Sequence, residues 1–547
     1  MDTRTRFRTQ IVGALPVITH YLERLDLATT IDDLVPWQGD IPLGTLVEVL
    51  VANRLLQPKA LFRVGQWAET AAVTDYYGLT AEQLNDDRLG RSLERLAAHA
   101  PDIQAALVLK AIEHFELDVT QIHYDLTTVE LYGAYEVEST EGQPPPSPMP
   151  TYGRTKSGRK HVKQVQLGLD VTGDGDGGVP VGHLPLDGNA GEVTSHLENL
   201  KLLARTLPRG KLLYISDTKL DAPKNLLAIA ARKGQFLCGG VLLQQLQARY
   251  LGLRGELKPV DYYPDSQARR PAEERDRYEA FEVAEHLEGP VDGRAVRLDY
   301  RLIFVWSESK ARQEATTRER HTAKIVAEFE AVQRNLGRYS LKTTEAIVRR
   351  LEAAKGKYAE GALLDYRLVQ DTDGRFRLTW EIDAAALGRC QHLEGVYVLK
   401  TNLPERSCPL AEVLRTYKGQ SRVERRFHHL KGPLAVAPMF LKNPERIAGP
   451  MCVLVWALMV LALMERQVRR ELKGRPLHGL YPEGRPSPSP TGPALIRGLS
   501  GLCIVIVHEG GETHRRLSQP DPVQRRGIQL LGINSERLQT FKRRCGM

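Results

Sequence analysis

Cysteine is sparse in this 547-residue sequence, and its six copies never stand in a spacing that binds metal or forms a disulfide scaffold. There is no CxxC pair and no closely spaced set of cysteine and histidine. The sequence therefore predicts neither a structural zinc site nor a disulfide framework, and a reducing cytosol suits it. A calcium loop is not predicted either. In the run GDGDGG, Pro185 stands at the twelfth position from Asp174, where a closing glutamate belongs, so this run is predicted to be a hairpin turn.

Long apolar runs are nearly absent as well. Residues 447–464 form one, with Gly449 and Pro450 near its start. We predict a buried core helix here and keep a membrane span as the alternative, since nothing else in the chain indicates a membrane. The first ten residues, MDTRTRFRTQ, are polar and predict no signal peptide. A cytoplasmic protein without a membrane partner is expected.

Positive charge is in modest excess. Lysine and arginine number 75 against 67 aspartates and glutamates, which gives a net charge of +8 and a pI of about 9.0. This balance suits a polyanionic partner, although many basic proteins never bind nucleic acid. The chain is also too long for one hydrophobic core, so about three or four domains are expected from its length.

The pattern of apolar residues divides the chain into five regions. Residues 1–115 space apolar side chains three or four apart and are predicted to be helical. Residues 116–240 alternate strands with helices, and residues 241–393 break this alternation with strands around a long charged helical segment. Residues 394–470 return to a strand followed by helices, and residues 471–547 end in a basic region. We therefore predict an α/β protein interrupted by a separate α+β module.

Two aspartates occupy strand positions. Asp125 lies within a strand predicted over about residues 121–133, and Asp217 ends the apolar run KLLYIS. Rigid strand ends hold carboxylates in place, and carboxylates are the hard ligands that Mg²⁺ and Mn²⁺ prefer. Alone, Asp125 could be a solvated edge-strand residue and Asp217 a helix N-cap. Their interpretation depends on a third acid.

A predicted helix in the C-terminal third carries that acid. Tyr417, Gln420, Glu424 and Lys431 recur at i, i+3, i+7 and i+14, which places them on one stripe of a helix together with Phe427. Helices in soluble proteins usually turn an apolar stripe inward, so a stripe of this composition indicates a working face. The alternative is that Glu424 only forms an ion pair with a neighbouring arginine.

These residues resemble the DDE transposases of bacterial insertion sequences, in particular the insertion-sequence-four type with the signature Tyr-x2-Arg-x3-Glu-x6-Lys. The matching residues are Tyr417, Gln420, Glu424 and Lys431. The spacing agrees at every interval, and glutamine replaces the signature arginine, with Arg422 nearby as a substitute. The resemblance extends to YDLTTVELYG around Asp125, YGRTKSGRKHVKQVQLGL, and ISDTKLDAPKNL around Asp217, and it covers roughly residues 115–240 and 390–470.

The resemblance implies a ribonuclease H-like mixed sheet flanked by helices, with catalytic parts at 116–240 and 394–470, an insertion domain at 241–393 and an all-helical, DNA-binding N-terminal domain. It implies that Asp125, Asp217 and Glu424 are catalytic and bind two Mg²⁺, for which Mn²⁺ can substitute. The implied DNA contacts are Tyr417, Gln420, Arg422 and Lys431. The implied reaction is hydrolysis at the element ends, followed by attack of the freed 3′-hydroxyl on target DNA. A homodimer on double-stranded DNA, in a bacterial nucleoid, would carry it out.

A basic run after the proline-rich loop is the second candidate for DNA contact. It has no acid from Thr151 to Leu169, and its predicted DNA-binding residues are Arg154, Lys156, Arg159 and Lys160. A solvated surface loop is the alternative. Two other functions stay open for the whole chain: a catalytically silent or domesticated DNA-binding derivative, and a ribonuclease H-like nuclease that cuts without joining.

Overall fold

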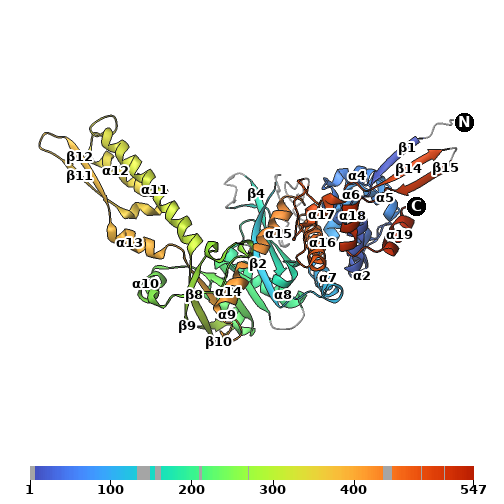
Figure 1. The fold of residues 1–547 in the computed structure, drawn as a ribbon, viewed down its shortest axis with the longest axis horizontal. Coiled ribbons are helices and arrows are strands. Elements are labelled where there is room, and N and C mark those ends of the chain that lie inside the picture. Colours follow the sequence, from blue (N-terminus) through green and yellow to red (C-terminus); the bar gives the residue numbers. More distant parts are fainter. Residues whose placement is uncertain are drawn as a thin grey trace, which may run out of the picture. The chain divides into compact units, whose positions relative to one another are not determined.

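The computed structural model describes residues 6–131, 148–153, 162–207, 212–268, 270–434, 446–481, 483–509 and 512–547. The chain is a mixed α/β protein with a large mixed sheet and flanking helices (Figure 1). It divides into two units. Unit 1 comprises Met1–Phe236, Val291–Arg294 and Thr416–Met547, and unit 2 comprises Leu237–Pro290 and Ala295–Arg415.

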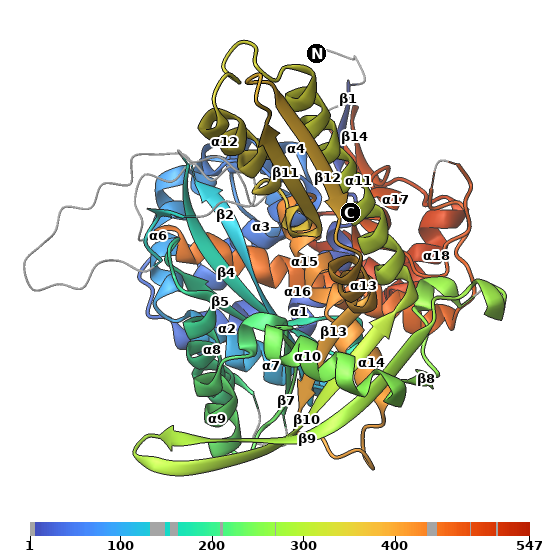
Figure 2. The ribbon, with the colours of Figure 1, turned by 90° about the vertical axis from the view of Figure 1, so that its left-hand side faces the viewer.

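The sheet of unit 1 is built around β2 (Gln121–Leu131). β4 (Lys163–Thr172) runs antiparallel to β2, and β5 (Pro180–Leu186) runs antiparallel to β4. β6 (Leu213–Ser216) lies on the other side of β2 and is parallel to it. Figure 2 shows β5, β4 and β2 side by side. The strand predicted over 121–133 and the hairpin predicted at GDGDGG are both confirmed, the latter as the β4–β5 connection.

Two short strands complete this part of the sheet. β3 (Thr151–Tyr152) pairs with the start of β4. β7 (Gln235–Gly240) begins in unit 1, where the Gln235 N–H donates to the carbonyl of Leu212 at 3.1 Å. Helices α7 (Ala100–Phe115), α8 (Glu192–Thr206) and α9 (Pro223–Ala231) pack around the sheet. The helix α15 (Ser421–Lys431) contacts β2 and β4.

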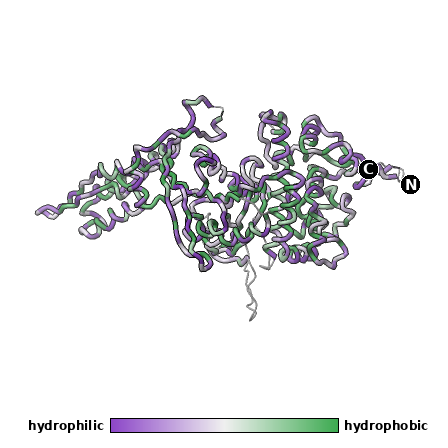
Figure 3. The backbone as a smooth tube through the Cα atoms, turned by 90° about the horizontal axis from the view of Figure 1, so that it is seen from below, coloured by the Kyte–Doolittle hydropathy of each residue, from purple (hydrophilic) through white to green (hydrophobic). Residues whose placement is uncertain are grey.

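A long apolar helix, α16 (Ala448–Leu472), forms the core of the helical part of unit 1. It packs against α1 (Leu15–Arg24), α3 (Leu43–Leu56), α6 (Asp86–Ala97) and β5. In length and composition α16 would suffice to cross a membrane, but 89% of its apolar window is buried inside the protein. The prediction of a buried core helix is therefore confirmed. In Figure 3 hydrophobic and hydrophilic residues alternate along most of the backbone, as amphipathic elements require.

The predicted all-helical N-terminal region and separate C-terminal region need correction. β1 (Arg6–Ile11) is a strand, and it pairs with β14 (Cys503–Glu509), which pairs in turn with β15 (Glu512–Leu517). The two ends of the chain thus share one small sheet and belong to the same unit. The sequence did not reveal this strand, because RFRTQI is largely exposed and contains too few apolar residues to show the alternation of a half-buried strand. The other helices of unit 1 are α2 (Leu27–Leu34), α4 (Val64–Thr70), α5 (Val73–Tyr77), α17 (Gly492–Gly498), α18 (Pro522–Leu530) and α19 (Ser535–Arg544).

Unit 2 contains the predicted insertion. Its strands are β8 (Lys258–Val260), β9 (Tyr278–Val291), β10 (Arg294–Ser307) and β13 (Val396–Thr401), and the last two pair antiparallel. Its helices include α10 (Gln244–Leu253) and α13 (Ala384–Leu393), and α14 (Leu410–Lys418) crosses the boundary at Arg415. Apart from Val291–Arg294, the predicted insertion at 241–393 falls inside unit 2, but the unit continues to Arg415 and takes in β13.

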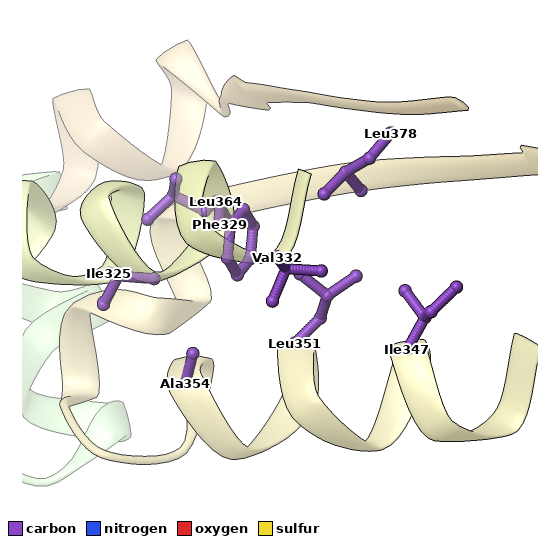
Figure 4. Packing of buried hydrophobic residues seen from close by; sticks show 8 residues of the cluster. All are labelled: Ile325, Phe329, Val332, Ile347, Leu351, Ala354, Leu364 and Leu378. Carbon is purple, nitrogen blue, oxygen red and sulfur yellow. The ribbon is translucent and has the colours of Figure 1, made fainter. Parts of the chain in front are cut away.

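The long charged segment of unit 2 is two helices with a core of their own. α11 (Glu308–Arg334) and α12 (Thr344–Lys355) pack against each other and against the hairpin of β11 (Leu364–Gln370) and β12 (Phe376–Ile382). Figure 4 shows the cluster of buried side chains between them, which includes Phe329, Leu351 and Leu378. This separate core explains why the sequence pattern of the segment differs from that of its surroundings.

Candidate functional site

Two of the three predicted acids lie at corresponding positions of neighbouring segments. β2 and β6 run parallel, with His123 opposite Ile215. Extended by two residues, this register places Asp125 of β2 opposite Asp217, which directly follows β6. Side chains two apart on a strand share a face, so Asp125 lies on the same face as His123. The sequence put both acids on strands, and only the register shows that they are neighbours.

Both carboxylates are half-buried and organise the backbone next to them. One oxygen of Asp125 accepts the N–H of Leu126 at 2.7 Å. Asp217 is the N-cap of the short helix Thr218–Leu220, and its Oδ1 accepts the N–H of Lys219 at 2.9 Å. The N-cap interpretation of Asp217 is thus confirmed. A carboxylate has two oxygens, so capping leaves the ligand interpretation open.

The predicted continuous helix around residue 420 is wrong. α14 ends at Lys418 and α15 begins at Ser421, with Gly419 and Gln420 in the turn between them. A Cβ at position 419 would lie 2.9 Å from both the carbonyl oxygen of Thr416 and the imidazole of His123. Close packing of the turn on β2 therefore requires glycine. Consequently Tyr417, which is half-buried at the end of α14, does not share a helical stripe with the residues of α15.

α15 has one exposed and one buried face. The exposed residues around Glu424 are Arg425, His428 and Lys431, so the acid and the lysine of the predicted stripe do share a face. Phe427 does not belong to it, because its side chain is buried with those of Val423 and Leu430. Glu424 also lies in the first turn of α15, where the helix dipole favours a negative charge.

Gln420 points into the protein. Its Nε2 donates to the carbonyl oxygen of Tyr124 at 2.8 Å, and its Oε1 lies 3.2 Å from Nδ1 of His123. The helix that follows this turn, α15, lies against β2 (Figure 1). The contact of Gln420 with DNA stays a prediction, but both polar ends of its amide already have protein partners.

Arg422 is likewise turned inward. Its guanidinium pairs with Asp174 of the GDGDGG turn, and the side chain is only 17% exposed. Burial, and after it the charge of Arg425, lower the pKa of Arg422 to about 10. A phosphate contact by Arg422 would have to compete with Asp174, so its predicted role as a substitute for the signature arginine stays a prediction.

A buried ion-pair network that the sequence did not reveal fixes α15 to the same turn. Arg426 is 1% exposed, and its guanidinium donates to the carbonyl oxygens of Gly178 at 2.7 Å and Gly177 at 2.9 Å. It also donates to Glu465 of α16 at 2.8 Å. Burial alone would raise the pKa of Glu465, but the charges of Arg426 and Arg469 outweigh it and hold that pKa below its usual value.

Glu465 ties a second helix into the network. It accepts the N–H of Gly492 at 2.7 Å, and Arg466, the next residue of α16, pairs with Asp176 of the turn at 2.5 Å. Thus Arg422, which the resemblance implied as a DNA contact, and its neighbour Arg426 both form ion pairs within the protein. The only feature of the sequence that pointed to these ion pairs was an arginine-rich helix together with a glycine-rich turn that contains aspartates.

The three acids are not gathered into a preformed metal site. Among the residues that the structure describes, no three side chains of histidine, cysteine, aspartate or glutamate are close enough to hold a metal ion together. Asp125 and Asp217 adjoin in the sheet, whereas Glu424 stands on the exposed face of α15. The basic residues Arg154, Lys156, Arg159 and Lys160 lie outside the described residues.

The comparisons with known proteins concern the N-terminal helices. Residues 7–107 match the family described as "Domain of unknown function (DUF4277)". This domain is found in transposase-like proteins in general. The match ends before Asp125 and leaves the three acids untouched. A comparison with curated proteins finds no match. The N-terminal part of the chain is therefore similar to a domain that transposase-like proteins carry.

Proposed function

We propose that the chain is a metal-dependent DDE transposase that binds the ends of an insertion sequence, cleaves them and joins the freed 3′-hydroxyl to target DNA. The observation that carries the proposal is the register of the parallel strands β2 and β6, which, extended by two residues, places Asp125 opposite Asp217 just beyond the end of β6. α15, which carries Glu424, is docked on one of these strands. The mixed sheet with its flanking helices supports the ribonuclease H-like fold that this function implies.

The donor set suits hard divalent cations. Asp125, Asp217 and Glu424 offer only carboxylate oxygens, which Mg²⁺ and Mn²⁺ prefer. These three residues would hold the ions. Two cations bound together supply activation of an attacking oxygen and stabilisation of the leaving oxygen in phosphoryl transfer. Because the three side chains are not gathered in the described structure, the proposal requires the side chain of Glu424 to turn toward the two aspartates when DNA binds, while α15 stays docked on β2.

The exposed face of α15 supplies the cations for a DNA backbone. Arg425, His428 and Lys431 surround Glu424 on that face, and positively charged side chains near an active carboxylate favour phosphate binding. Tyr417 remains a proposed contact at the end of α14. Pairing of two element ends would need two copies of the chain, so a homodimer on double-stranded DNA is part of the proposal.

One observation favours the alternative of a DNA-binding derivative that does not cleave. The residue that replaces the signature arginine, Gln420, is bonded to protein groups, and the three acids stand apart. A nuclease that cuts without joining would share every acid, so the reaction products distinguish it from a transposase.

The test is a reaction with the inverted repeats that flank the coding region. End DNA and target DNA are incubated with the protein and Mg²⁺, and the products are sized on denaturing gels. The proposal predicts cleavage that leaves a 3′-hydroxyl, followed by joined products. Specific end binding without cleavage would contradict it in favour of the silent derivative, and cleavage without joined products would favour the nuclease.

A further inference from the structure

We infer that Gln420 is a positioning residue whose side-chain amide fixes the start of α15 to β2 and thereby sets where Glu424 stands relative to Asp125. The inference rests on the proposed function, because it concerns the assembly of the same three acids. It gives Gln420 a role inside the protein in place of the DNA contact that the resemblance implies.

The side-chain amide of Gln420 forms a hydrogen bond close to both aspartates. Its Nε2 donates to the carbonyl oxygen of Tyr124, the residue before Asp125. The same carbonyl accepts the hydroxyl of Ser216 at 2.9 Å, and Ser216 is the residue before Asp217. One backbone oxygen therefore joins β2, β6 and the start of α15. Glu424 follows Gln420 by four residues, or about one helical turn.

His123 completes the contact. Its side chain is buried, and its Nδ1 faces Oε1 of Gln420 at 3.2 Å. Since Nε2 of Gln420 donates to Tyr124, its Oε1 must accept, and the proton therefore sits on Nδ1 of His123. The amide matches its surroundings because it donates on one side and accepts on the other.

This double role explains why glutamine suits a position where the signature has arginine. A guanidinium has donors only, so an arginine at 420 could donate to Tyr124 but could not accept from Nδ1–H of His123, and the imidazole would have to take its other tautomer. His123 and Gln420 therefore form a matched pair, and a DNA contact is not needed to explain the glutamine.

The packing leaves the turn little freedom. Gly419 lies so close to His123 that a Cβ would come within 2.9 Å of the ring. Further along α15, Arg426 holds the helix to the carbonyls of Gly177 and Gly178. Gln420 is the fixed point on the β2 side of Glu424, and Arg426 is the fixed point on the loop side.

The test compares two substitutions of the same kind. Gln420→Met keeps the length of the side chain and removes both bonds. Gln166→Met is the matched control: Gln166 is also buried, and its Nε2 donates to the carbonyls of Gly188 at 3.3 Å and Ala190 at 2.9 Å. Gln420→Met should lower the single-turnover cleavage rate about 10- to 100-fold, as loss of an outer-shell partner does, at unchanged affinity for end DNA. Gln166→Met should cleave like the wild type.

Gln420→Arg separates positioning from DNA contact. If residue 420 gripped a phosphate, arginine would strengthen end binding and preserve or raise cleavage. The positioning role instead predicts slower cleavage by this variant, because the longer guanidinium cannot take the place of the amide between the carbonyl of Tyr124 and the ring of His123. Wild-type or faster cleavage by Gln420→Arg, or a Gln420→Met variant that weakens binding while its rate at saturating DNA is unchanged, would overturn the inference and leave the proposed function standing.

Hydrogen exchange gives a readout that does not need catalysis. The backbone amides of Val423–Phe427 should exchange faster in Gln420→Met than in the wild type, and Gln166→Met should not change them. If the wild-type protein fails to cleave, the proposed function falls, and this exchange alone decides the inference. Unchanged exchange in Gln420→Met would overturn it.

Discussion

At the scale of single residues, the register of two strands does most to define the site. Asp125 and Asp217 are 92 positions apart in the sequence, and each has an ordinary structural explanation when it is considered alone. The register of β2 and β6 brings the two positions to the same edge of the sheet, and two negative charges held close together are unfavourable unless cations or protons compensate them. Binding of a divalent cation, as proposed, would compensate them.

The first prediction concerns these acids. Asp125→Asn, Asp217→Asn and Glu424→Gln each keep the shape of the side chain and remove its charge, so each should abolish end cleavage while end binding stays largely intact. Cleavage gels and gel-shift titrations on the same protein preparations measure the two effects. Any variant that still cuts in Mg²⁺ removes its residue from the catalytic set.

The second prediction concerns the buried pair of Arg426 and Glu465. Glu465→Gln leaves the guanidinium of Arg426 without its buried counter-charge, and breaking such a pair costs about 3–5 kcal/mol of unfolding free energy. Urea unfolding followed by circular dichroism measures it. The control is Arg91→Met, which breaks the exposed pair of Arg91 and Asp87 on α6 and should change stability by less than about 0.5 kcal/mol. An equal loss in both variants would contradict the assigned importance of the buried network.

At the scale of elements, the break between α14 and α15 decides how Glu424 is presented. The sequence spacing suggested one helix because its polar residues, from Tyr417 to Lys431, fit a helical period over about four turns. Gly419 was the sign of a break, but a single glycine inside a periodic pattern does not distinguish a tolerated glycine from a required one. What requires it here is the close approach of His123, which lies almost 300 residues away in the sequence.

The third prediction follows from that approach. Gly419→Ala introduces a Cβ within 2.9 Å of a backbone oxygen and of the ring of His123, so it should lower the unfolding free energy by about 1–3 kcal/mol and slow cleavage. Gly388→Ala is the matched control, because Gly388 lies in α13 with open space around it. Alanine there should stabilise by about 0.5–1 kcal/mol. A neutral Gly419→Ala variant would show that the turn is not closely packed on β2.

At the scale of the whole molecule, the sequence predicted an interrupted α/β protein, and the structure has this arrangement. The strand with Asp125, the strand before Asp217, the GDGDGG hairpin and the buried helix α16 were all predictable from local patterns. The small sheet of β1 with β14 was not, because pairing across about 500 residues has no local signal. The ion pairs of Arg422 and Arg426 were missed for the same reason, since an arginine on a helix looks alike whether it faces solvent or a buried carboxylate.

The fourth prediction concerns acid stability. Burial lowers the pKa of five histidines of unit 1 from 6.5 to about 4, namely His20, His123, His183, His196 and His429. Below pH 6.5 the unfolded chain therefore binds protons that the fold does not, so stability falls as the pH falls. Glu48 and Asp170 act in the opposite direction, because burial raises the pKa of each to about 7.

Five histidines destabilise the fold on acidification and two acids stabilise it, so the net effect is a loss of stability. The melting temperature of the protein should therefore fall between pH 6.5 and pH 4. Thermal unfolding by circular dichroism at several pH values measures this. His183→Gln, which removes one buried histidine, should flatten the dependence. A melting temperature that rises on acidification would contradict the burial of these histidines in neutral form.

The central claim is that Asp125, Asp217 and Glu424 come together around a pair of divalent cations. It is tested most directly by a structure of the protein bound to its end DNA in Mn²⁺, with the metal located by anomalous scattering. The account predicts two manganese peaks about 3.5–4 Å apart, ligated by the carboxylates at 125, 217 and 424. Manganese bound elsewhere, or a Glu424 carboxylate that stays remote from both aspartates with DNA in place, would contradict it.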